Sequence, residues 1–168
     1  HVGSRDLGFA GADWVAELGL DLVELMDTRL DPVRIVAAAD PAFDPKSGRF
    51  RVATEYQRLT EAWLAEQGYD GRVVRAYGAT EVFPPEDADC VVDNTATGET
   101  LRANGLHIFA TLMQSSTRLY ASPAALEDPA KRREIENFTM LCKSVLDARR
   151  RVMIEANVPA DRLDAVVA

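Results

Sequence analysis

Short apolar runs alternate with amphipathic stretches along the chain, and this alternation predicts an α/β fold. The clearest segment predicts a strand over 50–54, a helix over 55–67 and a second strand from Arg72. Gly68 is expected to end this helix, because glycine readily adopts the left-handed conformation that closes many helices. We interpret the segment as a βαβ unit.

The other strands are predicted from apolar runs of the same kind. They begin at Asp6, Asp21, Val33 and Asp89, and two more, LHIFATLM and TRLYAS, follow Gly105. A turn at Asp31-Pro32 is expected to separate the second and third of these runs. A loop over 40–48 is the best candidate for a hinge or crossover between two structural units.

A long helix is predicted after Asp128, a preferred N-cap residue that stands directly before Pro129. A strand over 151–157 and a helix opening at Pro159 are expected to follow it. The long helix carries one apolar stripe at helical spacing, made of Ile135, Phe138, Leu141, Cys142, Val145 and Leu146.

The composition indicates a globular chain and argues against several functions. Of the 168 residues, 47% are hydrophobic and 27% are charged, as in ordinary globular domains. A formal net charge of -8 argues against nucleic-acid binding by general electrostatics. No run reaches the roughly 18 apolar residues of a membrane helix. Cys90 and Cys142 give neither a disulfide framework nor metal-ligand spacing, which favours a cytoplasmic location.

Both ends of the sequence lack the signals of a natural chain terminus. The chain begins at His1 without Met or a secretory signal, and it stops within an apolar helical pattern. We therefore expect a fragment of a longer protein.

The segment most informative about function is DNTATGETL, residues 93–101, which directly follows a predicted strand. The first amides of the helix after it have no partner within the helix, so they can face an anion. Gly98 permits close backbone approach, and Thr95, Thr97 and Thr100 add hydroxyl groups. This set suits a phosphate monoester.

Asp93, at the end of the predicted strand, suits the hydroxyl groups of a ribose that lies one sugar away from the phosphate. The segment is therefore a candidate phosphoribosyl site. A Thr-rich turn that only caps a helix explains the pattern about as well. It is not a Walker loop, because no Gly-Lys-Ser/Thr follows.

Several segments, in one order across nearly the whole chain, carry a family resemblance. DNTATGETLRANGL is the most specific, and the others are RDLGFAGADWVAELG, RVATEYQRLTEAWLAEQGY, GATEV, SSTRLYASPAAL and KSVLDARRRVMIEANVPADRLDAVV. With these segments the chain resembles the catalytic part of ATP phosphoribosyltransferase, the first enzyme of histidine biosynthesis.

The resemblance implies a two-lobed α/β fold like that of type II periplasmic binding proteins, with a discontinuous first lobe. The first lobe would comprise 1–39 and 115–150, and the second lobe would comprise 40–114 with the phosphoribosyl diphosphate loop. Residues 151–168 would begin a C-terminal regulatory domain.

The resemblance also implies roles for individual residues. Asp93 would hold the ribose hydroxyls, and Glu81 would be a second catalytic acid in the same cleft, unless it is only an exposed turn carboxylate. Gly11 and Asp13 match the family's turn on the nucleotide side, although Asp13 could equally be a helix N-cap. The residues expected to bind phosphoribosyl diphosphate are Asp93, Thr95, Ala96, Thr97, Gly98, Glu99 and Thr100.

The implied reaction transfers phosphoribosyl from phosphoribosyl diphosphate to N1 of ATP and releases pyrophosphate. Mg²⁺ is implied because the charge of the diphosphate must be masked, while the sequence shows no protein metal cage. The family further implies association into dimers or hexamers.

Two alternatives stay open at this point. A type I phosphoribosyltransferase has a similar loop, but that family prefers two adjacent acids where this chain has Asp93-Asn94. A non-catalytic two-lobed binding module, or an inactive fragment of the enzyme, would bind a ligand without releasing pyrophosphate. The chain also departs from the family where MDTRLDPVR replaces a Gly-rich stretch after Val23.

Overall fold

A computed structural model describes residues 4–149, 151–153, 155 and 157–159. Its strands form one mixed six-stranded sheet in the order β1-β6-β2-β5-β3-β4. The strands are β1 (Leu7–Gly11), β2 (Val23–Ala39), β3 (Phe50–Thr54), β4 (Gly71–Arg75), β5 (Cys90–Thr95) and β6 (His107–Ala121). The helices are α1 (Ala12–Glu17), α2 (Gln57–Gln67), α3 (Glu99–Ala103), α4 (Pro123–Glu127) and α5 (Pro129–Arg149), with a short 3-10 helix η1 (Thr80–Val82).

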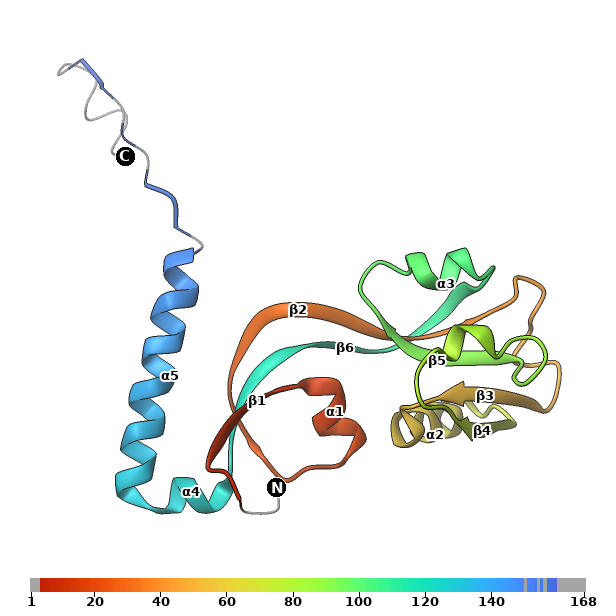
Figure 1. Ribbon diagram of the computed structural model, residues 1–168, viewed down its shortest axis with the longest axis horizontal. Coiled ribbons are helices and arrows are strands. Elements are labelled where there is room, and N and C mark those ends of the chain that lie inside the picture. The colour runs from red at the N-terminus through yellow and green to blue at the C-terminus, as the bar shows by residue number, and fades with distance from the viewer. Residues whose placement is uncertain (1–3, 150, 154, 156, 160–168) are drawn as a thin grey trace.

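The two long strands β2 and β6 connect two parts of the molecule (Figure 1). We call the part with β1, α1, α4 and α5 the first lobe, and the part with β3, β4, β5, α2 and α3 the second lobe. In the first lobe the C-terminal end of β6 pairs with β1. In the second lobe the C-terminal part of β2 pairs with β5. The predicted lobe boundaries at 39/40 and 114/115 stay predictions.

The prediction of two strands separated by a turn at Asp31-Pro32 is wrong, because β2 runs without a break from Val23 to Ala39. The residues expected to form the turn form a bulge within β2 instead. Arg29 and Asp31 have φ values of 56° and 48°, and the register against β6 shifts on either side of Leu30. The runs LHIFATLM and TRLYAS likewise form one strand, β6. Pairing between the two long strands supplies the backbone partners that a turn would have supplied.

The core of the second lobe follows from the side-chain alternation of β2. Successive strand residues point to opposite faces, and Ile35 and Val36 are both fully buried. Ile35 packs in the cluster on the α2 side, with Phe50, Tyr56, Trp63, Leu64, Cys90 and Val92 among its members. Val36 packs in the cluster on the α3 side, with Ala53, Val91, Leu101 and Leu106.

The predicted βαβ unit is confirmed. Strands β3 and β4 are parallel, with Val52 opposite Val73, and α2 connects them. Gly68 ends α2 in the left-handed conformation, with φ 68°. The helix begins at Gln57, two residues later than predicted.

The start of the long helix is also confirmed, whereas α4 before it was not predicted. The Asp128 carboxylate accepts hydrogen bonds from the amides of Ala130 (2.9 Å) and Lys131 (3.3 Å). Of the predicted apolar stripe, Ile135 is buried and Leu141 is 61% exposed. No helix in the described part of the chain is long and apolar enough to cross a membrane.

The predicted strand over 151–157 is not found among the residues described there, which are 151–153, 155 and 157. Of the helix predicted to open at Pro159, all that follows Pro159 lies outside the described residues.

We expect Asp128→Ala to lower the free energy of unfolding by about 1 kcal/mol, because two amides of the first turn of α5 lose their acceptor. Asp147→Ala is the matched control, since a carboxylate near the C-terminal end of the same helix gains nothing from the helix dipole. Chemical denaturation of both variants measures the difference. An equal loss in the two variants would contradict the capping role.

Candidate functional site

The segment 93–101 forms the end of β5, a tight loop and the start of α3. Gly98 is buried and has φ 80°, a backbone conformation that side chains resist, and a Cβ atom there would lie 3.1 Å from Ile108 Cδ1. The Gly98 amide donates to Thr95 Oγ1 (2.7 Å), and the Glu99 amide donates to Thr97 Oγ1 (3.3 Å). The loop therefore holds its shape through its own threonine hydroxyls.

A hollow of about 470 Å³ opens beside this loop. Most of the residues predicted for the site meet there, whereas Gly98 and Glu99 shape the loop without lining the hollow. Its lining consists of Glu55, Gly78, Glu81, Asp93, Asn94, Thr95, Ala96, Thr97, Thr100 and Leu101. The loop is thus open to a ligand rather than packed shut against its neighbours.

Asp93 is half-buried at the edge of the hollow. Its carboxylate accepts hydrogen bonds from the Asn94 amide (2.7 Å) and from the Thr80 hydroxyl. Burial raises the pKa of Asp93 above its ordinary value of 3.8, these hydrogen bonds oppose the rise, and the nearby charges of Glu81 and Glu55 add to it. The hollow therefore carries concentrated negative charge.

This charge restricts what the hollow can hold. A bare phosphate or diphosphate is repelled by three carboxylates, whereas sugar hydroxyls can donate to them and a metal-bound diphosphate has its charge masked. Within the described residues, no group of three or more His, Cys, Asp or Glu side chains is placed to hold a metal ion. The acids of the hollow fit a divalent ion only as a minority of its ligands, beside ligand phosphates.

Sequence reasoning missed Glu55 and Thr80 as site residues. A signal for Glu55 was available, because it directly follows β3, and β3 is the parallel neighbour of β5. The carboxyl ends of parallel strands meet at one edge of a sheet, so Glu55 and Asp93 come together there. Thr80 is fully buried in η1, and no pattern in GATEV distinguishes it from an ordinary core threonine.

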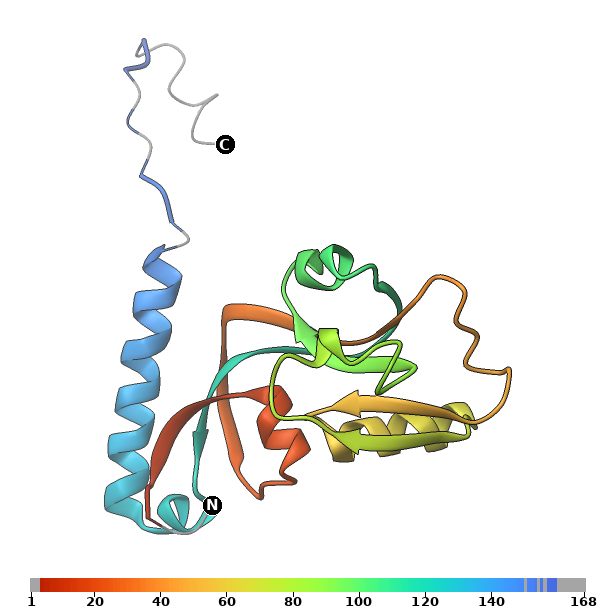
Figure 2. The same ribbon diagram turned by 45° about the vertical axis from the view of Figure 1, so that its right-hand side comes forward.

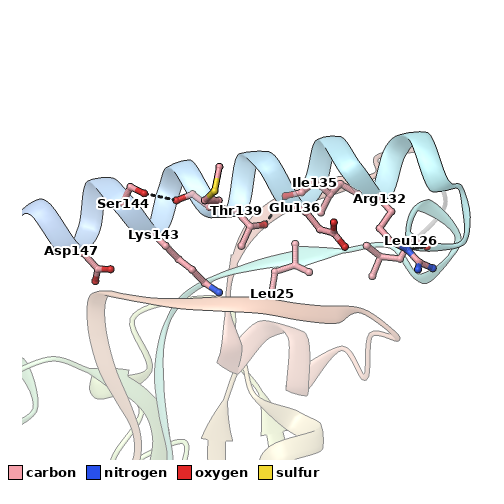
Figure 3. Close-up of a pocket in the computed structure, with 10 residues that line it drawn as sticks. Leu25, Leu126, Arg132, Ile135, Glu136, Thr139, Lys143, Ser144 and Asp147 are labelled. Atoms are coloured by element: carbon pink, nitrogen blue, oxygen red, sulfur yellow. Dashed lines mark hydrogen bonds between the residues drawn. The ribbon is translucent and has the colours of Figure 1, made fainter.

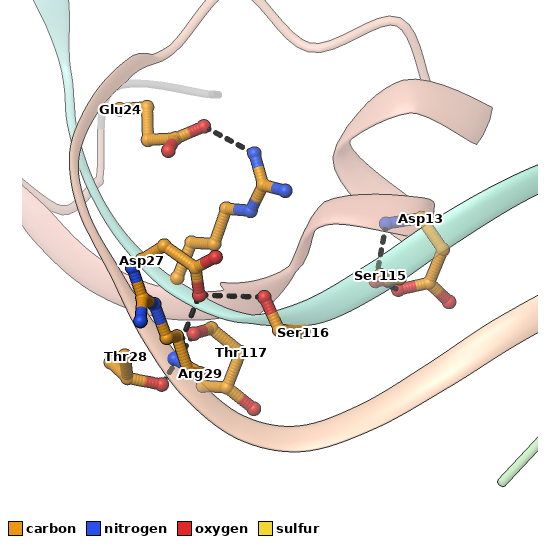
Figure 4. A network of polar contacts seen from close by, with 9 residues as sticks. Asp13, Glu24, Asp27, Thr28, Arg29, Ser115, Ser116 and Thr117 are labelled. Atoms are coloured by element: carbon orange, nitrogen blue, oxygen red, sulfur yellow. Dashed lines mark hydrogen bonds and ion pairs between the residues drawn. The ribbon is translucent and has the colours of Figure 1, made fainter.

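The structure places Gly11 and Asp13 outside this hollow. Asp13 is only 5% exposed and accepts hydrogen bonds from Tyr56 Oη (2.8 Å) and Ser115 Oγ (2.6 Å). Figure 4 shows Asp13 beside Ser115 at the start of α1. The alternative that Asp13 is the N-cap of α1 is wrong, since Gly11 occupies the N-cap. The nucleotide-side role of these two residues stays a prediction.

A larger hollow of about 680 Å³ lies between α5 and β2 and contains none of the predicted site residues. Figure 3 shows α5 above β2 with Leu25, Ile135 and Thr139 between them. The rim carries charges of both signs, among them Arg132 and Asp147. Such a mixture specifies no ligand, so the hollow beside the β5 loop is the candidate site.

Comparison with solved structures defines the class of the fold. The chain is similar to holo ArgBP from T. maritima (16% identity, TM-score 0.51, covering 89% of this chain and 66% of that chain). It is also similar to the GluR0 ligand-binding core in complex with L-glutamate (10% identity, TM-score 0.53, covering 88% and 69%). The predicted two-lobed α/β fold of the type II binding-protein class, with a discontinuous first lobe, is confirmed.

More specific matches identify the family. A model of the ATP phosphoribosyltransferase family matches residues 1–144, and the chain belongs to this family. An ATP phosphoribosyltransferase of Pelotomaculum thermopropionicum is 39% identical over an alignment of 178 positions. The alignment covers 100% of this chain and 61% of the relative. That of Desulforudis audaxviator is 41% identical over 176 residues, covering 99% and 61%. The chain thus spans about 61% of the length of these relatives.

A solved structure supports the same assignment. The ATP phosphoribosyl transferase (HisG:HisZ) complex from Thermotoga maritima includes a chain that superimposes with a TM-score of 0.80 at 26% identity. The match covers 87% of this chain and 72% of that one. The resemblance of the sequence to this family is therefore confirmed.

We expect Glu81→Gln to lower the pKa of Asp93 toward 3.8, because the substitution removes a nearby negative charge. Carbon-13 NMR of the Asp93 carboxyl during a pH titration measures the shift, with Glu86→Gln as a control outside the hollow. Because the pKa of Asp93 is raised by folding, this group's contribution to stability falls as pH rises above 3.8. The Gln variant should show a smaller fall. An unchanged pKa would contradict the electrostatic coupling.

Proposed function

We propose that this chain is the catalytic part of an ATP phosphoribosyltransferase. It transfers the phosphoribosyl group of phosphoribosyl diphosphate to N1 of ATP and releases pyrophosphate. The observation that carries the proposal is the hollow in which the threonine-rich loop and the strand-end acid Asp93 face one space. The family match supports it.

The roles of the residues follow from their positions around the hollow. The loop residues Ala96 to Thr100, together with Thr95, bind the 5-phosphate through backbone amides and hydroxyls. The Thr95 and Thr97 hydroxyls accept hydrogen bonds from loop amides, and these hydroxyls and amides could instead donate to phosphate oxygens. Asp93 accepts hydrogen bonds from the ribose hydroxyls.

The acids also suit the electronic demand of the reaction. As the bond from ribose C1 to the diphosphate oxygen breaks, positive charge develops on the sugar, and N1 of ATP then forms the new bond to C1. Asp93 and Glu81 lie in the same hollow, so their negative charge stabilises that positive charge. The proposed catalysis is therefore by positioning and electrostatics, without a covalent intermediate on the protein.

Mg²⁺ fits this site as a partner of the substrate. One or two of the carboxylates of Glu55, Glu81 and Asp93 would bind the ion, and most of its ligands would come from the diphosphate and water. When bound, the ion would mask the charge of the leaving pyrophosphate. We assign ATP to the side of Gly11 and Asp13, and Asp13 can contact it only after its present hydrogen bonds break.

We further infer a homo-oligomer, as dimers or hexamers, in the cytoplasm, with 151–168 as the start of a regulatory domain. The Thermotoga maritima relative is described as a complex, which supports association in the family. The predicted lobes, 1–39 with 115–150 and 40–114, place the phosphate loop in the second lobe.

An assay of pyrophosphate release tests the reaction directly. The chain is incubated with Mg²⁺, phosphoribosyl diphosphate and either ATP, a free purine base or orotate. Release of pyrophosphate when ATP is the acceptor, and not when a purine base or orotate is, supports the proposal. Release only with a base would indicate a type I phosphoribosyltransferase, and binding of phosphoribosyl diphosphate without release would indicate a non-catalytic module or an inactive fragment.

We expect Thr97→Ala to weaken binding of phosphoribosyl diphosphate by about 10- to 100-fold, the effect of one lost charge-assisted hydrogen bond. Titration calorimetry in the presence of Mg²⁺ measures it. Thr111→Ala, at an exposed position of β6 outside the hollow, is the matched control. Unchanged affinity in a folded Thr97→Ala variant would refute the role of the loop.

A further inference from the structure

Helix α1 of the first lobe lies against the beginning of α2 in the second lobe (Figure 2). The Glu17 carboxylate accepts hydrogen bonds from the amides of Arg58 and Leu59, each at 3.0 Å. These amides belong to the first turn of α2 and have no acceptor within the helix. The N-cap residue of α2, Tyr56, provides no side-chain cap. Helix α2 therefore takes its N-terminal cap from the other lobe, as a carboxylate placed where the helix dipole favours one.

Tyr56 forms a second polar connection between the lobes. Its side chain is fully buried, and its hydroxyl donates to Asp13 Oδ2 (2.8 Å) while it accepts from Asn94 Nδ2 (3.0 Å). Burial and the hydrogen bond to Asp13 raise the pKa of Tyr56, so the hydroxyl keeps its proton. The Trp14 ring packs against the Tyr56 ring, with centroids 5.0 Å apart.

Asp13 is anchored firmly on the side of the first lobe. Ser115 Oγ donates to Asp13 Oδ1 at 2.6 Å, and the Asp13 amide donates to Ser115 Oγ at 3.0 Å. One oxygen of the Asp13 carboxylate thus accepts a hydrogen bond from Ser115 of β6, and the other accepts one from Tyr56 of the second lobe. Asn94, on the far side of Tyr56, is the neighbour of Asp93 in the candidate site. One continuous chain of hydrogen bonds runs from the first lobe to the edge of the hollow.

We propose that Asp13, Glu17 and Tyr56 form an interlobe latch that holds the two lobes against each other. Its hydrogen bonds join charged or polar groups, so they can break and re-form, and the contact between the Trp14 and Tyr56 rings accompanies them. The other connection between the lobes passes through β2 and β6 at the bulge with positive φ at Arg29 and Asp31. Beside this bulge, the Ser116 hydroxyl of β6 donates a hydrogen bond to the Asp27 carboxylate of β2 (Figure 4).

The latch makes Tyr56 and Asn94 positioning residues for Asp93. When Tyr56 is held by Asp13, Asn94 is fixed by its amide hydrogen bond, and the strand end that carries Asp93 is fixed with it. The latch itself does not rest on the proposed reaction, because all of its contacts are between residues of this chain.

The distance between the lobes tests the proposal. Nitroxide labels are attached to Cys142 on α5 and to a cysteine introduced by Lys46→Cys in the exposed loop before β3. Cys90 escapes labelling because it is fully buried and its pKa is raised to about 12. Double electron–electron resonance then gives the distribution of distances in the full 168-residue chain.

A single narrow distribution is expected for the labelled chain with its latch intact. Tyr56→Phe and Glu17→Gln each remove part of the latch with little change of shape, and each should broaden the distribution toward longer distances. Glu61→Gln, on the exposed face of the same helix α2, is the matched control and should leave the distribution narrow. Unchanged distributions in both latch variants, or equal broadening in the control, would overturn the latch.

Hydrogen exchange gives an independent measurement that does not depend on labels. In Glu17→Ala the amides of Arg58 and Leu59 should exchange at least about tenfold faster, because each loses a charge-assisted acceptor. Unchanged exchange at both amides would contradict capping across the lobes. Neither measurement uses phosphoribosyl diphosphate, so failure of the proposed reaction leaves the latch testable.

Discussion

Strand β5 lies between β2 and β3 in the sheet, and the pairing on both sides determines where the candidate site can be. Val36 of β2 stands opposite Asp93, and Thr54 of β3 stands beside Val92. Val91 and Val92 are fully buried on opposite faces, so a slip of one residue would exchange the two faces and lose both cores. Because the register is so strongly specified, Asp93 emerges at a fixed point of the sheet edge. The loop, the hollow and the hydrogen bond from Asn94 to Tyr56 all depend on that point.

The arrangement of charge at this edge is compatible with the proposed phosphate site beside an acidic hollow. Glu81 and Asp93 come from η1 and β5, and Glu55 directly follows β3, whereas the threonine hydroxyls lie on the loop toward α3. A ligand with a phosphate at one end and hydroxyl groups or a metal-bound diphosphate at the other satisfies both regions. A simple anion satisfies only the loop. The arrangement of charge thus favours a composite ligand, and the phosphoribosyl diphosphate with Mg²⁺ that we propose has that composition.

The elements whose signals are local were the ones that the sequence could predict. The βαβ unit, the Asp128 cap and the loop after β5 depend on neighbours a few residues away, and the structure contains all three. The breaks predicted within β2 and β6 were wrong, because a turn signal at Asp31-Pro32 competes with pairing between strands about 85 residues apart, and only the folded sheet supplies that partner. The contribution of Glu55 needed the strand order, which follows from tertiary packing. The burial of Asp13 depended on Tyr56 and Ser115, which are distant in sequence.

Asn94 is where the two polar systems of the molecule meet, and this placement has a physical consequence. Its backbone amide donates to the Asp93 carboxylate, while its side-chain amide donates to Tyr56. An aspartate at this position, as in loops with two adjacent acids, would place a second negative charge between Asp93 and Asp13. It would also have no hydrogen with which to donate to the Tyr56 hydroxyl, which already gives its own proton to Asp13. An amide at residue 94 is therefore the group that lets the site keep its acid and the lobes keep their connection through one residue.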